Sequence, residues 1–269
     1  MNKINAEEFL KNTEENVFST GFSEIDELLP NVDKGSIITI GARPAMGKTS
    51  FALSIVSHLL ADNKKVFYFS PSATVKRITK RLISNKLKIH SYEFEKELQT
   101  NENSIKEALK YYSDKNLYIN DKTNITVEDI ETEVKENIPD FVFIDYIQLL
   151  KMPKAPNFTD SINIAVQEIK RIANETGVIF VIISQLSRAV EERLDKRPLL
   201  SDIRNSSLLE ELSDIVLMIY RDGYYNLEDE TNKNLAEIIF RKNEFGPLFS
   251  VCLRFSSGIF CPNLKSCEF

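Results

Sequence analysis

Cysteine, histidine, glycine and proline are all sparse in this chain of 269 residues, and each shortage argues against a class of protein. The three cysteines, Cys252, Cys261 and Cys267, are odd in number and late in the chain, so they indicate reduced thiols in the cytoplasm and argue against a disulfide framework or zinc site. The two histidines, His58 and His90, have no metal-ligand neighbours in the sequence. Eight glycines and nine prolines favour a compact domain over a string of modules.

Long hydrophobic runs and an excess of positive charge are also missing. No apolar run approaches the length of a transmembrane helix, and the polar residues 1–15 do not resemble a signal peptide, so no membrane partner is expected. The net charge of −6 argues against a passive coat for nucleic acid. A contact with DNA would need a local basic surface, such as one that forms on oligomerisation.

Strand and helix patterns alternate along most of the chain, which predicts an α/β fold with a mostly parallel central sheet. Hydrophobic residues make up 42% of the chain, which suits one large domain, 20–269, preceded by a short helix and linker, 1–19. We expect parallel strands at 36–41, 65–70, 117–120, 141–145, 178–184 and 214–220. We expect helices at 5–15, 23–29, 48–60, 73–86, 103–113, 126–137 and 160–175. Antiparallel strands should complete the sheet at 235–241, 248–254 and 258–260.

A phosphate-binding loop is indicated by residues 41–50. They follow an apolar run, 37–40, and precede an amphipathic helical pattern, and strand, Gly-Lys-Thr and helix is the context that such a loop requires. Backbone N–H groups and the helix N-terminus would hold the phosphates of ATP, while Lys48 supplies a positive charge and the Thr49 hydroxyl binds Mg²⁺. The residues assigned to the nucleotide are Ala42, Arg43, Pro44, Ala45, Met46, Gly47, Lys48, Thr49 and Ser50.

Residues 141–145, Phe-Val-Phe-Ile-Asp, form a second motif. Four consecutive apolar residues predict a strand buried on both faces, and Asp145 at its carboxyl end should point into the crevice where α/β sheets bind ligands. An aspartate that only caps the next turn is the alternative. Beside a phosphate-binding loop, we interpret Asp145 as a catalytic carboxylate that holds Mg²⁺.

With these motifs placed, the chain resembles the C-terminal ATPase domain of DnaB-type replicative helicases, which has a RecA-like P-loop NTPase fold. The resemblance runs from about residue 20 to about residue 264 and includes alanine in place of the first glycine of the phosphate loop, at Ala42. It rests on motifs at 42–49, 144–149, 183–188, 195–204, 219–222 and 236–239.

The resemblance implies further roles. Gln185 would sense the γ-phosphate, Arg221 would bind the nucleotide, and Lys242 would act on the nucleotide of the neighbouring subunit. The implied assembly is a head-to-tail ring, a hexamer, that couples ATP hydrolysis to unwinding, with a primase or helicase loader as further partners. The residues assigned to single-stranded DNA are Lys196, Arg197, Arg204, Asn205 and Ser207.

Three departures from the family's pattern concern hydrolysis and DNA. Ser72 stands where the family has the glutamate that polarises the attacking water, and losing a positioned base costs ~10²–10⁴-fold in rate. Glu244 stands where the family has an arginine finger, which is worth roughly 10³–10⁵ in rate. In the DNA-contact stretch, Asn205 and Ser207 stand where the family has glutamate and glycine.

Two hypotheses from different classes follow. The first is the motor domain of a DnaB-like helicase, and the alternative is a hydrolysis-impaired paralogue that serves as a nucleotide-dependent scaffold or regulator of a replication complex. A recombinase or clock-type RecA relative fits the fold but not the loop at 195–198. A basic ridge on the predicted helix 73–86 is interpreted as an ordinary solvated face; its members are Lys76, Arg77, Lys80 and Arg81.

Overall fold

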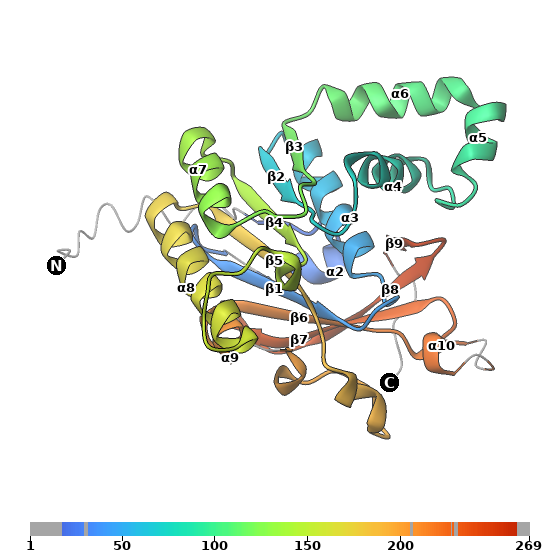
Figure 1. Cartoon of the computed structure of the whole chain (residues 1–269). Helices are drawn as coiled ribbons and strands as arrows, with labels where there is room; N and C mark the ends of the chain where they lie inside the picture. The colour runs from blue at the N-terminus through green and yellow to red at the C-terminus, as the bar shows by residue number, and fades with distance from the viewer. Residues whose placement is uncertain (1–17, 30–31, 205–206, 227, 229–230, 263–269) are drawn as a thin grey trace.

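One mixed sheet of nine strands organises the computed structural model, which describes residues 18–29, 32–204, 207–226, 228 and 231–262 (Figure 1). The strand order is β3-β2-β4-β5-β1-β6-β7-β8-β9. Neighbours from β3 to β6 run parallel, and β6 to β9 pair antiparallel. The bounds are β1 (Ile37–Ala42), β2 (Val66–Phe69), β3 (Leu117–Asn120), β4 (Phe141–Asp145), β5 (Ile179–Gln185), β6 (Ile215–Tyr220), β7 (Leu235–Asn243), β8 (Ser250–Ser256) and β9 (Ile259–Cys261). The predicted α/β fold with antiparallel C-terminal strands is therefore confirmed.

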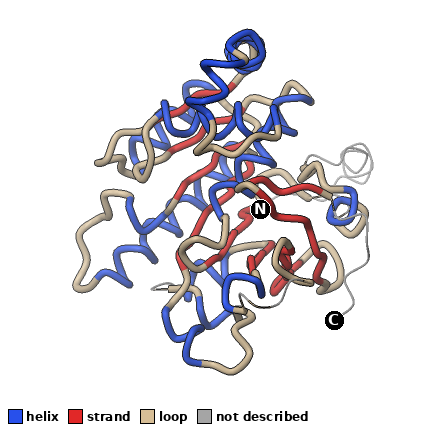
Figure 2. Tube along the Cα trace, turned by 90° about the vertical axis from the view of Figure 1, so that its right-hand side faces the viewer, coloured by secondary structure: helices blue, strands red, loops and turns tan. Residues whose placement is uncertain are grey.

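Helices cover both faces of the parallel strands (Figures 1 and 2). Side chains of α2, α3, α4 and α6 pack into one core, and those of α7, α8 and α9 into the other. The bounds are α2 (Ser23–Asp26), α3 (Lys48–Ala61), α4 (Val75–Leu87), α5 (Phe94–Thr100), α6 (Glu102–Ser113), α7 (Val127–Asn137), α8 (Phe158–Thr176), α9 (Ser207–Leu212) and α10 (Asp222–Tyr225). Short 3₁₀ turns lie at Ile147–Leu149, Arg188–Glu192 and Leu200–Asp202.

The two cores explain the continuous apolar runs of the parallel strands. On β2 and β4, Tyr68 and Phe143 point to the α3 side, while Phe67 and Val142 point to the α8 side. Side chains alternate between the faces of a strand, and a strand buried on both faces is apolar throughout. The same covering of both faces places the carboxyl ends of β1, β4 and β5 at one edge of the sheet, where the site is built.

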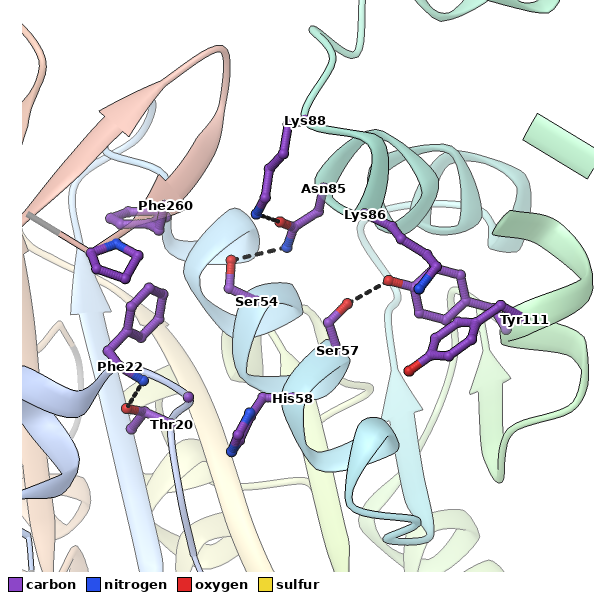
Figure 3. A pocket seen from close by; sticks show the side chains of 13 residues that line it. Thr20, Phe22, Ser54, Ser57, His58, Asn85, Lys86, Lys88, Tyr111 and Phe260 are labelled. Carbon is purple, nitrogen blue, oxygen red and sulfur yellow. Dashed lines mark hydrogen bonds between the residues drawn. The ribbon is translucent and has the colours of Figure 1, made fainter. Parts of the chain in front are cut away.

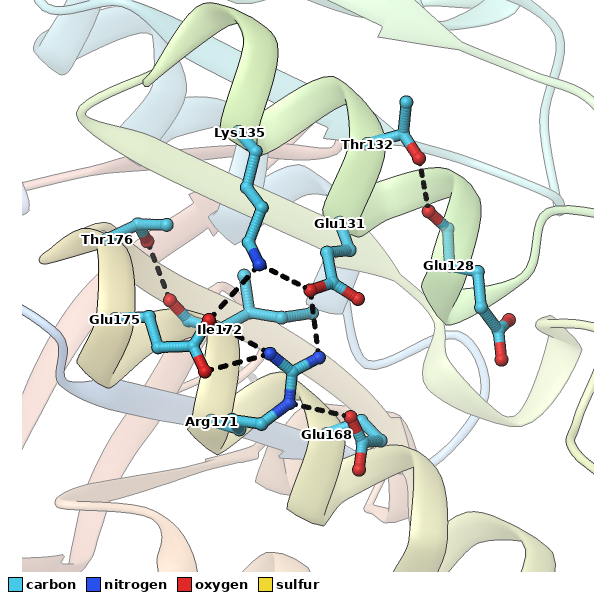
Figure 4. Close-up of polar contacts among 9 residues, drawn as sticks. All are labelled: Glu128, Glu131, Thr132, Lys135, Glu168, Arg171, Ile172, Glu175 and Thr176. Carbon is cyan, nitrogen blue, oxygen red and sulfur yellow. Dashed lines mark hydrogen bonds and ion pairs between the residues drawn. The ribbon is translucent and has the colours of Figure 1, made fainter.

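An ion-pair network on the surface joins α7 to α8 (Figure 4). Arg171 on α8 contacts Glu131 on α7 at 2.9 Å, and it also pairs with Glu168 and Glu175 on its own helix. Lys135 bridges Glu131 and Glu175. The network fixes two helices that lie on the face of the sheet opposite α3.

The sequence pattern does not predict α5, α9 or α10. No residue of α5 is buried, and α10 has only four residues, so neither leaves an apolar period in the sequence. The helix expected at 5–15 lies outside the described residues. The expectation of reduced thiols is wrong for Cys252, which is disulfide-bonded, whereas Cys261 is a free thiol. Spacing along a chain does not report which thiols fold together. In the described part of the chain, none of the helices has the length and apolarity that a membrane crossing needs.

Candidate functional site

The phosphate-binding loop lies between the end of β1 and the start of α3. Gly47, the residue before α3, has φ 97°, and the Cβ of any side chain there would lie 2.9 Å from the Phe255 ring. Only glycine fits both the positive φ and the close contact. The first backbone N–H groups of α3 have no acceptor within the helix, so the turn at Gly47 presents them to a phosphate group.

Lys48 extends from the first position of α3 across the carboxyl edge of the sheet. Its Nζ lies 5.4 Å from the centroid of the Tyr146 ring. Burial lowers the pKa of Lys48; the Asp145 carboxylate opposes this shift, and the positive charges of Arg81 and Arg43 add to it. A partly buried ammonium among other cations gains most from an anionic ligand, which is the situation that a nucleotide phosphate would relieve.

Asp145 ends β4 and its side chain is fully buried. The hydroxyl of Tyr68, on the neighbouring strand β2, donates a 2.8 Å hydrogen bond to Oδ2 of Asp145. Burial, and then the Asp145 carboxylate, raise the pKa of Tyr68 well above its ordinary value, so Tyr68 stays a neutral donor. Oδ1 of Asp145 is buried and has no hydrogen-bond partner within the described residues. A buried carboxylate oxygen requires such a partner, and a cation or its water would supply one.

The residues fit Mg²⁺ only if nucleotide phosphates share it. Across the described ranges, no group of three or more histidine, cysteine, aspartate or glutamate side chains could hold a metal alone. Mg²⁺ in nucleotide sites takes one or two protein oxygens together with phosphates and waters. The Thr49 hydroxyl, in the first turn of α3, and Oδ1 of Asp145 are protein oxygens of the required kind.

Gln185 ends β5, the strand beside β4. Its backbone N–H donates to Oε1 of Gln148 at 3.3 Å, and Nε2 of Gln148 donates to the Ser184 hydroxyl at 2.9 Å. Gln185 and Arg204 line one cavity of about 230 Å³. The other lining residues are Tyr146, Gln148, Leu149 and Phe158. The structure therefore brings the expected γ-phosphate sensor and one expected DNA-binding residue together.

The two arginines assigned to the nucleotide differ in their surroundings. Arg43 is nearly buried, and its guanidinium donates to the Leu186 carbonyl and to the Glu191 carboxylate, both at 2.9 Å. Arg221 donates to the carbonyl of Ala45 in the phosphate loop at 3.2 Å. Its Nε is buried without a partner in the described chain, and burial lowers the pKa of Arg221. Arg43 thus shapes the loop from behind, while Arg221 keeps an unused donor beside it.

The residues expected to contact DNA are not equally free to do so. Arg197 pairs with the Glu237 carboxylate of β7 at 2.7 Å. Lys196 lies over the Tyr225 ring, with its Nζ 4.8 Å from the centroid. Ser207 begins α9, and Asn205 lies outside the described residues. Within the described ranges, neither Lys196 nor the Arg204 of the cavity above has a carboxylate partner.

Lys242 lies far from the phosphate loop of its own chain. It pairs with Val216 near the start of β6, whereas the loop follows Ala42, which pairs with Ile219 near the end of β6. Its Nζ contacts the Glu211 carbonyl at 2.8 Å and the Glu244 carboxylate at 2.9 Å. Lys242 is at the opposite edge of the sheet, so any action on a nucleotide would be on that of another subunit.

Sequence reasoning missed Tyr68 and misjudged Arg81. Tyr68 is one of four apolar or aromatic residues of β2, and its pattern signals only a buried strand. Arg81 belongs to the ridge assigned to solvent, yet its charge acts on Lys48, Tyr68 and Asp145. Its position next to the buried Leu82 was the available signal. Ser72 is exposed between β2 and α4.

Comparison with known proteins gives one consistent family. A model of the family described as the DnaB-like helicase C-terminal domain matches residues 18–260. A replicative DNA helicase DnaB of Geobacillus stearothermophilus is 34% identical over 245 residues, covering 88% of this chain and 54% of that protein. A probable plasmid replicative DNA helicase of Chlamydia psittaci is 38% identical over 249 residues, covering 88% and 53%. The chain thus spans about half the length of these relatives.

Solved structures give the same result. An ATPase domain whose structure has been solved by itself superposes with a TM-score of 0.87 at 33% identity, covering 96% of both chains. A DnaB-like replicative helicase, solved in a study of its interactions with primase, superposes with a TM-score of 0.85 at 33% identity. That match covers 96% of this chain and 65% of the other.

Proposed function

Because this chain belongs to the DnaB-like helicase C-terminal domain family, we propose that it is the ATP-driven motor domain of a replicative DNA helicase. The observation that carries the proposal is the buried Asp145, whose Oδ1 lacks a partner beside Lys48 and the start of α3. A cation, an unpaired carboxylate oxygen and free helix N–H groups at one edge form a site for a metal-bound nucleoside triphosphate.

The residues divide the work at this site. Lys48 and the first N–H groups of α3 bind the phosphates, and Thr49 and Asp145 hold Mg²⁺, which supplies positive charge to the transferring phosphoryl group when bound. Tyr68 fixes Oδ2 of Asp145, so that Oδ1 is left for the metal or its water. Gln185 lines the cavity that also contains Arg204, and it would relay the state of the γ-phosphate towards DNA.

The whole protein would act as a head-to-tail ring, a hexamer, on single-stranded DNA. Lys242 supports this arrangement, because its place at the opposite edge of the sheet allows it to reach only the nucleotide of a neighbouring subunit. Lys196, Arg204 and Ser207 are the described candidates for the DNA contact, with Arg197 held by Glu237. A primase or a helicase loader is the further partner that we propose for the ring.

Steady-state ATP hydrolysis with and without single-stranded DNA tests the proposal. Lys48→Ala is the blank, and Lys106→Ala, which removes an exposed lysine of α6, is the matched control. Turnover that DNA stimulates, that Lys48→Ala abolishes and that Lys106→Ala retains is the expected result. ATP binding with turnover no better than the blank would instead favour the hydrolysis-impaired scaffold, a function that the names of the relatives above do not favour.

A further inference from the structure

Helices α3 and α4 start at the same edge of the sheet. Each follows one of the parallel strands, α3 after β1 and α4 after β2, and the two helices pack together. Nδ2 of Asn85 on α4 donates a 3.1 Å hydrogen bond to the Ser54 hydroxyl on α3 (Figure 3). This contact fixes which turn of α4 faces which turn of α3.

One turn nearer the start of each helix lie Arg81, four residues before Asn85, and Ser50, four residues before Ser54. Residues four apart lie on the same face of a helix, so Arg81 faces α3 at the turn that carries the phosphate loop. The flanking residue Leu82 is buried, and Arg81 is itself partly buried. The packing of α4 therefore directs Arg81 towards the phosphate site.

The neighbouring lysine of the same ridge has a different environment. Lys80 pairs with Glu95 at 2.6 Å and lies over the Phe94 ring, so its charge is balanced at the surface. Arg81 has no hydrogen-bond or ion-pair partner in the described part of the chain. Only the first of these two cations therefore has a counterion among the described residues.

The charges around Arg81 are unbalanced. Arg81 and Lys48 share the field of one carboxylate, Asp145, and burial lowers the pKa of both cations. The other nearby arginine, Arg77, is exposed and adds to the positive charge. Partly buried cations without enough carboxylates require an anion, and the turn that Arg81 faces is the one that would hold a nucleotide.

We propose that Arg81 contacts the γ-phosphate of the nucleotide bound to its own chain. This inference rests on the proposed function and adds a second cation to the site. Glu244 stands where the family has a finger from the neighbouring subunit, and Arg81 would supply part of that positive charge from within the same chain. Its role is electrostatic, because an arginine forms no covalent bond here and keeps its proton.

The test compares affinities for ATP and ADP in the full chain. Arg81→Met keeps a long apolar side chain and removes the charge, and Lys80→Met is the matched control one residue away. Dissociation constants for ATP and ADP, each with Mg²⁺, are measured by calorimetry in the wild type, both variants and Lys48→Ala. We expect Arg81→Met to weaken ATP binding about 10-fold to 100-fold, the worth of a charge-assisted hydrogen bond, and ADP binding less than about 3-fold.

The outcomes separate this inference from the proposed function. Equal losses of ATP and ADP affinity in Arg81→Met, or no loss, would overturn the γ-phosphate contact. A wild type that binds ATP no better than Lys48→Ala would overturn the proposed function as well. If Arg81→Met lowers the melting temperature, Arg81→Lys is measured beside it: partial recovery of the ATP preference supports the contact, and its absence in a folded variant contradicts it.

Discussion

Tyr68→Phe removes a single oxygen atom and with it the hydrogen bond to Oδ2 of Asp145. Because Oδ1 already lacks a partner, the variant leaves both oxygens of a buried carboxylate without a described donor. A hydrogen bond to a charged group is worth about 1.5–3 kcal/mol. For a domain of this size that corresponds to a melting temperature lower by about 3–12 °C without nucleotide.

Tyr112→Phe is the matched control, because it removes a buried hydroxyl whose partners are uncharged. Tyr112 contacts the Ser57 hydroxyl at 2.6 Å and the Leu82 carbonyl at 3.2 Å. Its loss should cost about 0.5–1.5 kcal/mol. Urea unfolding of the two variants and the wild type measures the difference directly.

The magnesium dependence of nucleotide binding separates orientation from stability. If Tyr68 orients Asp145 for the metal, the Mg²⁺ concentration for half-maximal ATP binding should rise about 10-fold in Tyr68→Phe, as for other outer partners of metal ligands. It should stay unchanged in Tyr112→Phe. Equal destabilisation of the two variants together with an unaltered Mg²⁺ requirement would refute the reasoning.

Three further predictions concern hydrolysis, pH and salt. Ser72→Glu, combined with Glu244→Arg, should raise ATP turnover by ~10²-fold or more, and unchanged turnover in a folded variant would show that the missing base and finger do not limit the rate. The folded-state pKa of Tyr68 is raised, so its contribution to stability is complete below pH ~10 and falls at higher pH; unfolding measured above pH ~10 should lose about 1.4 kcal/mol less per pH unit in Tyr68→Phe than in the wild type. Arg171→Ala should lower the melting temperature at low salt, and the difference should shrink at about 1 M salt, where the screening length is about 3 Å; a loss independent of salt would argue against an electrostatic role.

Local patterns in the sequence determine most of the fold. Continuous apolar runs predict strands buried on both faces, and the helical period between them predicts the crossovers, so the parallel sheet follows from the sequence alone. The phosphate loop and Asp145 follow as well, because both lie at ends of such strands. Elements without an apolar period, such as the exposed α5, cannot be found in this way.

Charge pairing is decided by the tertiary structure. Arg43 and Arg197 look like free cations in the sequence, yet each meets a carboxylate far along the chain, Glu191 and Glu237 respectively. Lys80 and Arg81 are consecutive and chemically similar, but successive residues of a helix point about 100° apart, so one meets Glu95 and the other faces α3. The sequence by itself determined the sheet, the phosphate loop and the family, because these depend on local periodicity and short motifs. Only the packing of distant elements decided which arginines are neutralised and which remain for a ligand, because the range of a charge is set by distance in space and not by separation along the chain.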